Sequence, residues 1–348
     1  MTLDELRDYA FQHNLPLDVN IELTQKCNFR CPHCYCSDNK HALTTSQAKD
    51  VVLKCHRAGV VFINFTGGEV TTRKDFPDIY RFTRELGCLV SIQTNLSHLS
   101  NQMKAALVAH KPRNISVTIY GTSEEEYKAF TGMNNGYSHV IENLDFLQEE
   151  GIHFALKAVL TRETWASAMA GRYERIAEKY GKTILWDGVI FGRKDADTSS
   201  LKHRLTPEKI VDFDRLNEAG CKFWDGEVAK RSKQDFVKCG GGISSFSVDS
   251  LGRASICSLY VSEKYNFLER DFDDTWQELK ASNDRMQALY KRSACSNCKK
   301  KSICRWCAAY AVLENGIPTK PVAFMCALAD ERTRRASTPV NIGTCPPP

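Results

Sequence analysis

Short apolar runs alternate with longer amphipathic segments along the first two-thirds of the chain. The apolar, β-branched runs are bounded by polar residues or glycine, and they predict strands at 17–24, 60–66, 89–94, 114–120, 153–160 and 183–191. The segments between them have helical periodicity and predict helices near 45–58, 75–86, 99–109, 137–150 and 166–180. Thr44 and Thr45 offer N-caps for the first of these helices.

Strands and helices that alternate in this way predict an α/β fold with a parallel sheet and right-handed crossovers. Six strands are too few for a closed eight-stranded barrel, so we expect an open, partial (β/α)6 barrel. In such barrels the chemistry lies on the loops after the carboxyl ends of the strands. The functional residues are therefore expected on those loops.

A polar stretch near residue 200 separates this pattern from the rest of the chain. Residues 205–220 predict one more helix, and beyond it strand alternation weakens while cysteine, glycine and charged residues become frequent. The expected organisation is an N-terminal segment at 1–16, the partial barrel at 17–200, a bridging helix and a cysteine-rich domain at 201–335, and a flexible tail at 336–348.

The composition is that of a soluble globular protein, with 42% hydrophobic and 26% charged residues among 348. The formal net charge of +5 is small, and no basic stripe is interleaved with aromatic residues, so we expect no nucleic-acid partner. No apolar run is long enough to span a membrane. The first ten residues are acidic and lack the apolar core of a signal peptide, which predicts a cytoplasmic protein.

The fifteen cysteines are unusual for a protein of this kind. Most lie in two tight groups, one near residue 30 and one at 295–307, with single cysteines between them. A secreted protein would spread its cysteines as a disulfide framework, usually in a much shorter chain. Clustering at short spacings predicts metal or iron–sulfur ligation instead.

The first group, Cys27, Cys31 and Cys34, directly follows the first predicted strand. A structural zinc ion or a fully ligated [4Fe–4S] cluster takes four protein ligands. Three thiolates would leave one iron open for a substrate. Cys36 lies two residues further on, but a Cys-x-Cys pair rarely reaches two corners of one cube. A zinc loop remains the alternative.

The Cys-x3-Cys-x2-Cys loop after the first strand resembles that of the radical SAM superfamily. The resemblance implies the partial (β/α)6 barrel and a [4Fe–4S] cluster on Cys27, Cys31 and Cys34, with S-adenosylmethionine (SAM) on the open iron. Electron transfer to the sulfonium then releases a 5′-deoxyadenosyl radical, which abstracts hydrogen from the substrate. The family places an aromatic residue near adenine just before the third cysteine, where this chain has His33, followed after Cys34 by Tyr35.

A second motif, Gly67-Gly68-Glu69, closes the second predicted strand and resembles the GGE motif of the same family. Two glycines allow the backbone to approach a ligand closely, and the carboxylate can bind an ammonium group. By the same resemblance, Asn95 and Thr118 are candidate contacts to the ribose or carboxylate of SAM, with packing or capping as the alternative role for both.

The second group resembles the SPASM extension of peptide-modifying radical SAM enzymes, which binds two auxiliary [4Fe–4S] clusters. The resemblance assigns Cys295, Cys298, Cys304 and Cys326 to one cluster. It assigns Cys239, Cys257 and Cys307 to the other, with Cys221 or an open iron in the fourth position. Paired Cys-x2-Cys is also the spacing of a zinc ribbon, which is the alternative here.

SPASM-bearing enzymes act mostly on peptides, and the segment from Thr118 to Gly121, with Tyr127 and Thr131-Gly132, resembles the peptide-maturase branch. Sulfatase-maturing relatives carry an aspartate as base where this chain has Ser258, a far poorer base. We therefore expect a thioether or carbon–carbon cross-link on a ribosomal precursor peptide. The alternatives are a sulfatase-maturase-like oxidase and a non-catalytic iron–sulfur or zinc scaffold.

The resemblance also implies partners. A radical SAM enzyme needs an electron donor such as flavodoxin or ferredoxin. Fewer than twenty residues precede the first predicted strand, which leaves no room there for a leader-binding domain. We therefore expect either a separate leader-binding protein or recognition by the barrel and the SPASM surface.

Overall fold

A computed structural model describes residues 2–36, 41–216, 239–304 and 306–336 of the chain. The six predicted strands are all present, as β1 (Asp18–Thr24), β2 (Phe62–Gly67), β3 (Leu89–Thr94), β4 (Asn114–Ile119), β5 (Phe154–Val159) and β6 (Ile184–Asp187). Each pairs in parallel with the next. The predicted parallel sheet is thus confirmed.

The sheet continues past β1 with three strands that the sequence pattern did not predict: β7 (Ser245–Val248), β8 (Arg253–Ser255) and β9 (Tyr265–Asn266). Its order is β6-β5-β4-β3-β2-β1-β7-β8-β9, so β6 and β9 are the edges and the described sheet is open. β7 is parallel to β1, whereas β8 and β9 are antiparallel to their neighbours. The cysteine-rich part of the chain therefore shares a sheet with the barrel, and a division near residue 200 stays a prediction.

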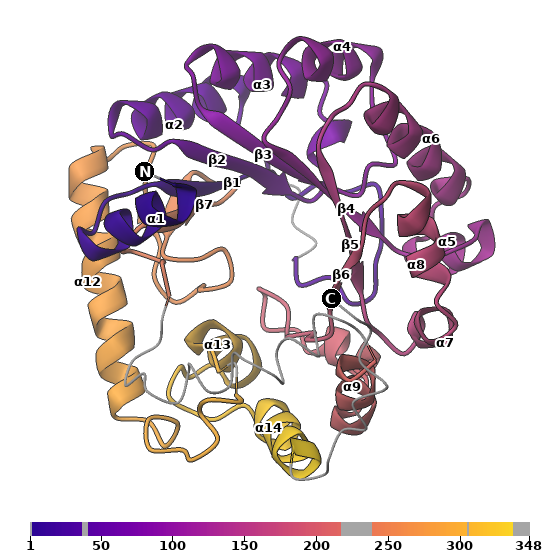
Figure 1. Ribbon diagram of the computed structural model, residues 1–348. Coiled ribbons are helices and arrows are strands. Elements are labelled where there is room, and N and C mark those ends of the chain that lie inside the picture. The colour runs from indigo at the N-terminus through magenta and orange to yellow at the C-terminus, as the bar shows by residue number, and fades with distance from the viewer. Residues whose placement is uncertain (1, 37–40, 217–238, 305, 337–348) are drawn as a thin grey trace.

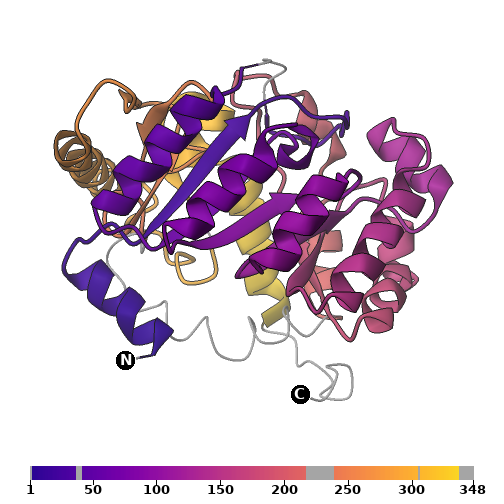
Figure 2. The same cartoon turned by 90° about the horizontal axis from the view of Figure 1, so that it is seen from above.

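Helices cover the outer face of the sheet (Figures 1 and 2). Those of the barrel are α2 (Thr45–Arg57), α3 (Phe76–Glu85), α4 (Asn101–Ala109), α5 (Glu124–Thr131), α6 (Gly136–Glu149), α7 (Trp165–Met169) and α8 (Arg172–Lys179). The others are α1 (Leu3–Gln12), α9 (Pro207–Asp214), α12 (Phe272–Lys291), α13 (Ala308–Asn315) and α14 (Ala323–Ala336). Thr44 is the N-cap of α2, where its side chain accepts a hydrogen bond from Gln47.

One helical expectation was wrong in detail, and one helix was missed. The single helix expected at 166–180 is interrupted, because Gly171 adopts a left-handed conformation between α7 and α8. The short helix α5 was not predicted at all, although Ser123 caps its first turn and Gly132 ends it. The predicted helix at 205–220 is α9, and the predicted tail at 336–348 lies almost wholly outside the described residues.

Alternation along each strand gives the sheet one apolar and one polar face. In β4, for example, Ile115, Val117 and Ile119 are buried in a core that also contains residues of the covering helices. The opposite face, toward the barrel interior, carries mostly polar side chains, among them Asn20, Glu22, Asn64, Ser91, Ser116, Thr118 and Lys157. The side chains that line the barrel interior are therefore mostly polar, which suits a polar ligand.

No helix in the described part of the chain is long and apolar enough to cross a membrane.

Candidate functional site

The loop that follows β1 brings together the three cysteines predicted as cluster ligands. Their thiols lie close enough for Cys34 and Cys27 each to raise the pKa of the Cys31 thiol, which burial already raises strongly. Burial raises the pKa of Cys27 to about 11. A hydrogen bond from the Cys36 side chain, together with Arg193 and Lys194, lowers the pKa of Cys34 to about 7. Cys36 thus stabilises the thiolate of Cys34 through a hydrogen bond.

The three cysteines of the loop supply one ligand fewer than a structural zinc ion takes. A tetrahedral zinc ion needs four ligand atoms within about 2.3 Å of one point. Among the described residues, no group of three or more His, Cys, Asp or Glu side chains converges in this way. A [4Fe–4S] cluster holds its thiolates further apart, at the corners of a cube. All cysteines that the structure describes are free thiols, so they are available as ligands.

Gly67 and Gly68 bring β2 against the base of the cysteine loop. A Cβ on Gly67 would lie 2.2 Å from the carbonyl oxygen of Thr24, and one on Gly68 would lie 2.2 Å from that of Lys26. Because neither glycine has a Cβ, the two backbone segments can come into hydrogen-bonding distance. The amide of Gly68 donates to the carbonyl of Thr24 at 2.6 Å, and the amide of Glu69 donates to the carbonyl of Lys26 at 2.8 Å. The approach to a ligand that was expected of these glycines stays a prediction, and the structure shows in addition that they approach the backbone of the loop.

Glu69 is 1% exposed and lies at the centre of a hydrogen-bond network. Its Oε1 accepts from the hydroxyl of Thr94 at 2.6 Å and from both the amide and the hydroxyl of Thr71, while its Oε2 accepts from the amide of Asn95 at 2.6 Å. Burial raises the pKa of Glu69 despite these bonds. Each carboxylate oxygen has about two acceptor positions, and Oε2 uses one of them for the amide of Asn95, so it retains capacity for a further donor. That fits the ammonium contact expected of Glu69.

Asn95 lies just after β3 and faces the cysteine loop. Its Nδ2 donates to Asn28 at 3.0 Å and lies 4.0 Å from the sulfur of Cys27. Its Oδ1 accepts from the amide and hydroxyl of Ser97, and Asn28 in turn donates to Ser97 at 2.8 Å. Sequence reasoning missed Asn28 and Ser97, which hold Asn95 in place. Thr118 lies one strand further along, half-buried on the polar face and paired in register with Lys157.

His33 belongs to an aromatic cluster beside the loop. Its ring stacks on Phe130 at 5.2 Å and lies 5.8 Å from Tyr120. Burial lowers the pKa of His33 to about 4, so the ring is neutral at physiological pH, and its buried Nδ1 has no hydrogen-bond partner. A neutral, planar ring in this position fits the aromatic role expected before the third cysteine.

The second cysteine group separates into two sets in the structure. Cys257 and Cys239 both raise the pKa of Cys307, which burial raises to about 11. In the other set, burial raises the pKa of Cys304 to about 11, and the nearby thiols of Cys326, Cys295 and Cys298 raise it further. The structure therefore brings together the same two sets of cysteines as the SPASM resemblance implies. Cys221 lies outside the described residues.

A buried ion pair that the sequence did not reveal lies between the two cysteine regions. Lys194 donates to Oε2 of Glu22 at 2.7 Å, and its amide donates to the carbonyl of Tyr35 at 2.9 Å. Although burial opposes it, Glu22 raises the pKa of Lys194 above its ordinary value. Burial raises the pKa of Tyr35 most strongly, and Cys36, Cys34, Glu22 and Cys257 raise it further, so Tyr35 lies near thiols of both cysteine regions.

Comparison with known families agrees with this site. Residues 21–169, which span the cysteine loop, Glu69, Asn95 and Thr118, match the model of the radical SAM superfamily. Residues 21–169 form a radical SAM domain. Such a domain implies a [4Fe–4S] cluster and SAM, and the partial barrel expected from the sequence is confirmed.

Curated relatives extend over nearly the whole chain. The mycofactocin maturase MftC of Mycobacterium ulcerans is 23% identical over 88% of this chain and 87% of its own. The PqqA peptide cyclase of Rhodopseudomonas palustris is also 23% identical, over 98% of this chain and 96% of its own. An AdoMet-dependent heme synthase of Methanosarcina barkeri is 22% identical over 87% of this chain and 94% of its own.

Among solved structures, that of Streptococcus suis SuiB bound to S-adenosylmethionine is similar to this chain, with a TM-score of 0.69. The match has 15% sequence identity and covers 93% of this chain and 81% of SuiB. At this identity the likeness shows a common fold. The match includes residues after β6, and so the common fold extends into the cysteine-rich part of the chain.

Proposed function

We propose that this radical SAM enzyme modifies a peptide, forming a thioether or carbon–carbon cross-link on a ribosomal precursor. The observation that carries the proposal is the arrangement of the cysteines. One set lies on the loop after β1, and Tyr35 connects it with a second set beside β7 and β8. The polar face of the barrel strands provides a lining that a peptide backbone can bind through hydrogen bonds.

In this proposal Cys27, Cys31 and Cys34 hold the cluster and leave one iron for SAM. When bound, the cluster supplies the electron that cleaves SAM reductively. Glu69 accepts the ammonium of SAM through Oε2 while Thr94 and Thr71 hold Oε1. Asn95 and Thr118 are the further candidate contacts, and Gly67 and Gly68 fix the loop against β2.

Two auxiliary [4Fe–4S] clusters are part of the proposal. Cys295, Cys298, Cys304 and Cys326 hold one of them with four thiolates. Cys239, Cys257 and Cys307 hold the other, whose fourth ligand is either Cys221 or absent. The burial that raises the pKa of Cys304 and of Cys307 to about 11 favours neutral thiols in the absence of metal. Cluster binding therefore requires these thiols to lose their protons.

The substrate class follows from the relatives and from the site. MftC is named as a maturase and the PqqA enzyme as a peptide cyclase, and each matches this chain over most of its length. The heme synthase relative supports a porphyrin substrate as a second candidate. The polar barrel face favours the peptide, because a porphyrin presents a large apolar surface. A separate protein that delivers the precursor leader remains part of the proposal.

Mass spectrometry tests this function directly. The reconstituted enzyme is incubated anaerobically with SAM, dithionite and each short peptide encoded beside its gene. We expect one peptide to lose hydrogen mass and to give a cross-linked fragment pattern. Conversion of iron-coproporphyrin under the same conditions, with every peptide unchanged, would contradict the proposal.

A further inference from the structure

Glu163 and His203 form a hydrogen-bonded pair at the mouth of the barrel. Glu163 lies in the loop after β5, and His203 ends a short 3₁₀ helix, Ser199–His203, in the segment after β6. Nδ1 of His203 lies 2.5 Å from Oε1 of Glu163. The strands β1–β6 are parallel, so the pair lies at the same end of the sheet as the cysteine loop that follows β1.

The two segments that carry this pair are fixed to each other. The amide of Arg162 donates to the carbonyl of His203 at 3.1 Å, and Nε of Arg162 donates to the carbonyl of Arg204 at 2.9 Å. Arg204 is buried and forms an ion pair with Glu314 of α13. The backbone on both sides of the pair is therefore held in place, which favours a fixed geometry for the side chains.

The hydrogen bond determines which nitrogen of His203 carries the proton. Burial opposes the ionisation of Glu163, but hydrogen bonds from His203 and Thr161 hold its pKa below the ordinary value. Glu163 is therefore ionised at neutral pH and can only accept, so Nδ1 of His203 is the donor. In the neutral ring the lone pair is then on Nε2, which has no hydrogen-bond partner among the described residues. A base that a carboxylate orients has this arrangement.

The pair also lies within electrostatic reach of the cysteine loop. Burial is the main cause that lowers the pKa of His33 to about 4, while the charge of His203 lowers it further and that of Glu163 raises it. His33 lies between the second and third cysteines of the loop. The side chain of His203 is 26% exposed, so Nε2 can be reached by a substrate.

Two other carboxylates near the cysteine loop are already engaged. Glu69 accepts hydrogen bonds from Thr94 and from the amide of Asn95, and its remaining capacity is assigned to SAM. Glu22 pairs with Lys194 at 2.7 Å. Neither is as free as Nε2 of His203 to accept a proton from a peptide.

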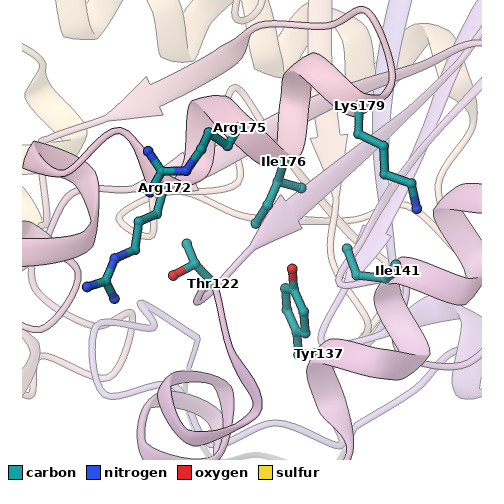
Figure 3. Close-up of a pocket in the computed structure, with 7 residues that line it drawn as sticks. All are labelled: Thr122, Tyr137, Ile141, Arg172, Arg175, Ile176 and Lys179. Carbon is teal, nitrogen blue, oxygen red and sulfur yellow. The ribbon is translucent and has the colours of Figure 1, made fainter.

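The pocket between α6 and α8 offers no such group either (Figure 3). Its volume is about 380 Å³, and its lining contains three cationic side chains but no histidine or carboxylate. Arg172 pairs there with Glu126 at 3.2 Å, and Lys179 pairs with Asp145 at 2.6 Å. The best-placed proton acceptor is therefore the pair at the barrel mouth.

We propose that His203 is the general base of the cross-linking reaction and that Glu163 orients it. The assignment rests on the proposed function, because it gives a residue to that reaction. Cross-linking breaks one C–H bond and either an S–H or a second C–H bond of the peptide, and it forms a C–S or C–C bond. One hydrogen leaves as an atom to the 5′-deoxyadenosyl radical, which becomes 5′-deoxyadenosine. The other leaves as a proton to Nε2 of His203 and an electron to an oxidised auxiliary [4Fe–4S] cluster, which is reduced by one electron.

The proton position on His203 is tested without any turnover. Nitrogen-15 NMR of the reconstituted protein, labelled at histidine, distinguishes the two neutral tautomers at mildly alkaline pH. The signals of His203 are those that His203→Gln lacks. We expect the Nδ1–H form to predominate in the wild type and the Nε2–H form to gain in Glu163→Ala. A wild-type ring with its proton on Nε2 would overturn the assignment.

Single-turnover rates test the base itself, with the precursor peptide that the wild type cross-links. His203→Gln should slow product formation about 100-fold or more, and Glu163→Ala about tenfold, because a general base contributes typically about 10²–10⁴-fold. The ratio of 5′-deoxyadenosine to product should rise in both, since hydrogen abstraction does not need the base. Imidazole in the buffer should restore part of the rate of His203→Ala.

His153→Gln is the matched control. Nδ1 of His153 lies 3.0 Å from Oδ1 of Asn114 at the opposite end of β5, so this variant should form product at the wild-type rate. A wild-type rate in His203→Gln would overturn the assignment. An equal loss of 5′-deoxyadenosine and product, with weaker SAM binding, would also overturn it, because the pair would then act on SAM. Cross-linking of no peptide by the wild type would instead contradict the proposed function.

Discussion

Lys194 and Glu22 form an ion pair at 2.7 Å although 172 positions separate them in the chain. The two side chains are 9% and 5% exposed, so the pair is buried. It ties the segment after β6 to β1 and to Tyr35, and so positions the cysteine loop. Oε1 of Glu22 has no hydrogen-bond partner, which makes the carboxylate depend on Lys194 all the more.

Removing Lys194 should therefore destabilise the protein strongly. Lys194→Met leaves a buried, unpaired carboxylate and should lower the free energy of unfolding by about 3–5 kcal/mol. Chemical denaturation of the cluster-free protein measures this. The double variant Glu22→Leu/Lys194→Met should recover much of the loss. The control is Arg81→Met, which breaks an exposed pair with Asp78 and should cost no more than about 1 kcal/mol.

Gly68→Ala should disturb the junction between β2 and the cysteine loop. The added Cβ would meet backbone atoms of Lys26 and Gln25, which cannot move aside as a flexible side chain could. We expect a loss of about 2–3 kcal/mol in unfolding free energy together with lower iron content after reconstitution. The matched control is Gly188→Ala, whose Cβ would make only ordinary contacts with Ile210 and Leu160. Equal stability of the two variants would contradict the close approach.

Glu69→Gln should weaken SAM binding and leave the iron content unchanged. The substitution removes the carboxylate charge beside the expected ammonium, and calorimetric titration should show an affinity about tenfold lower. Thr71→Val serves as the control, because it removes one hydrogen bond to Glu69 but keeps the charge. If Thr71→Val lowers the affinity as much as Glu69→Gln, the carboxylate only shapes the turn.

Ser258→Ala should retain most product formation on the true peptide substrate. A general base contributes typically about 10²–10⁴-fold to the rate, and an unactivated hydroxyl cannot supply that factor. Ser258 is half-buried in the turn after Cys257. Single-turnover rates measure the effect. If turnover collapses while cluster content and SAM cleavage stay normal, the peptide cross-linking proposal loses its main argument against a sulfatase-maturase-like oxidase.

Much of this molecule can be predicted from its sequence, because the signals are local. The six barrel strands are short apolar runs with clear polar ends, and each lies within a few residues of its expected position. The cysteine spacing and the glycines of β2 belong to a family motif. The short helix α5 and the strands β7–β9 were missed, since elements of two to eight residues carry too little periodicity to stand out.

The supporting contacts could not be predicted, because they join residues far apart in the chain. Asn28 meets Asn95 across 67 positions, and Arg175 and Tyr137 line one pocket from two different helices. The role of Gly68 also depends on contacts with Lys26 and Gln25 that only the folded chain makes. The sequence suggests that the glycine lets the backbone approach a ligand, and the structure adds that it also lets β2 approach the backbone of the loop.

The most direct test of the central claim is the amount of 5′-deoxyadenosine that the anaerobically reconstituted protein forms from SAM after dithionite reduction. The wild type should hold about twelve irons, four for each of three clusters, and should form 5′-deoxyadenosine. The triple variant Cys27→Ala/Cys31→Ala/Cys34→Ala should lose about a third of the iron and all of the product, while Cys36→Ala keeps both. Product formation by the triple variant, or none by the iron-loaded wild type, would contradict the account.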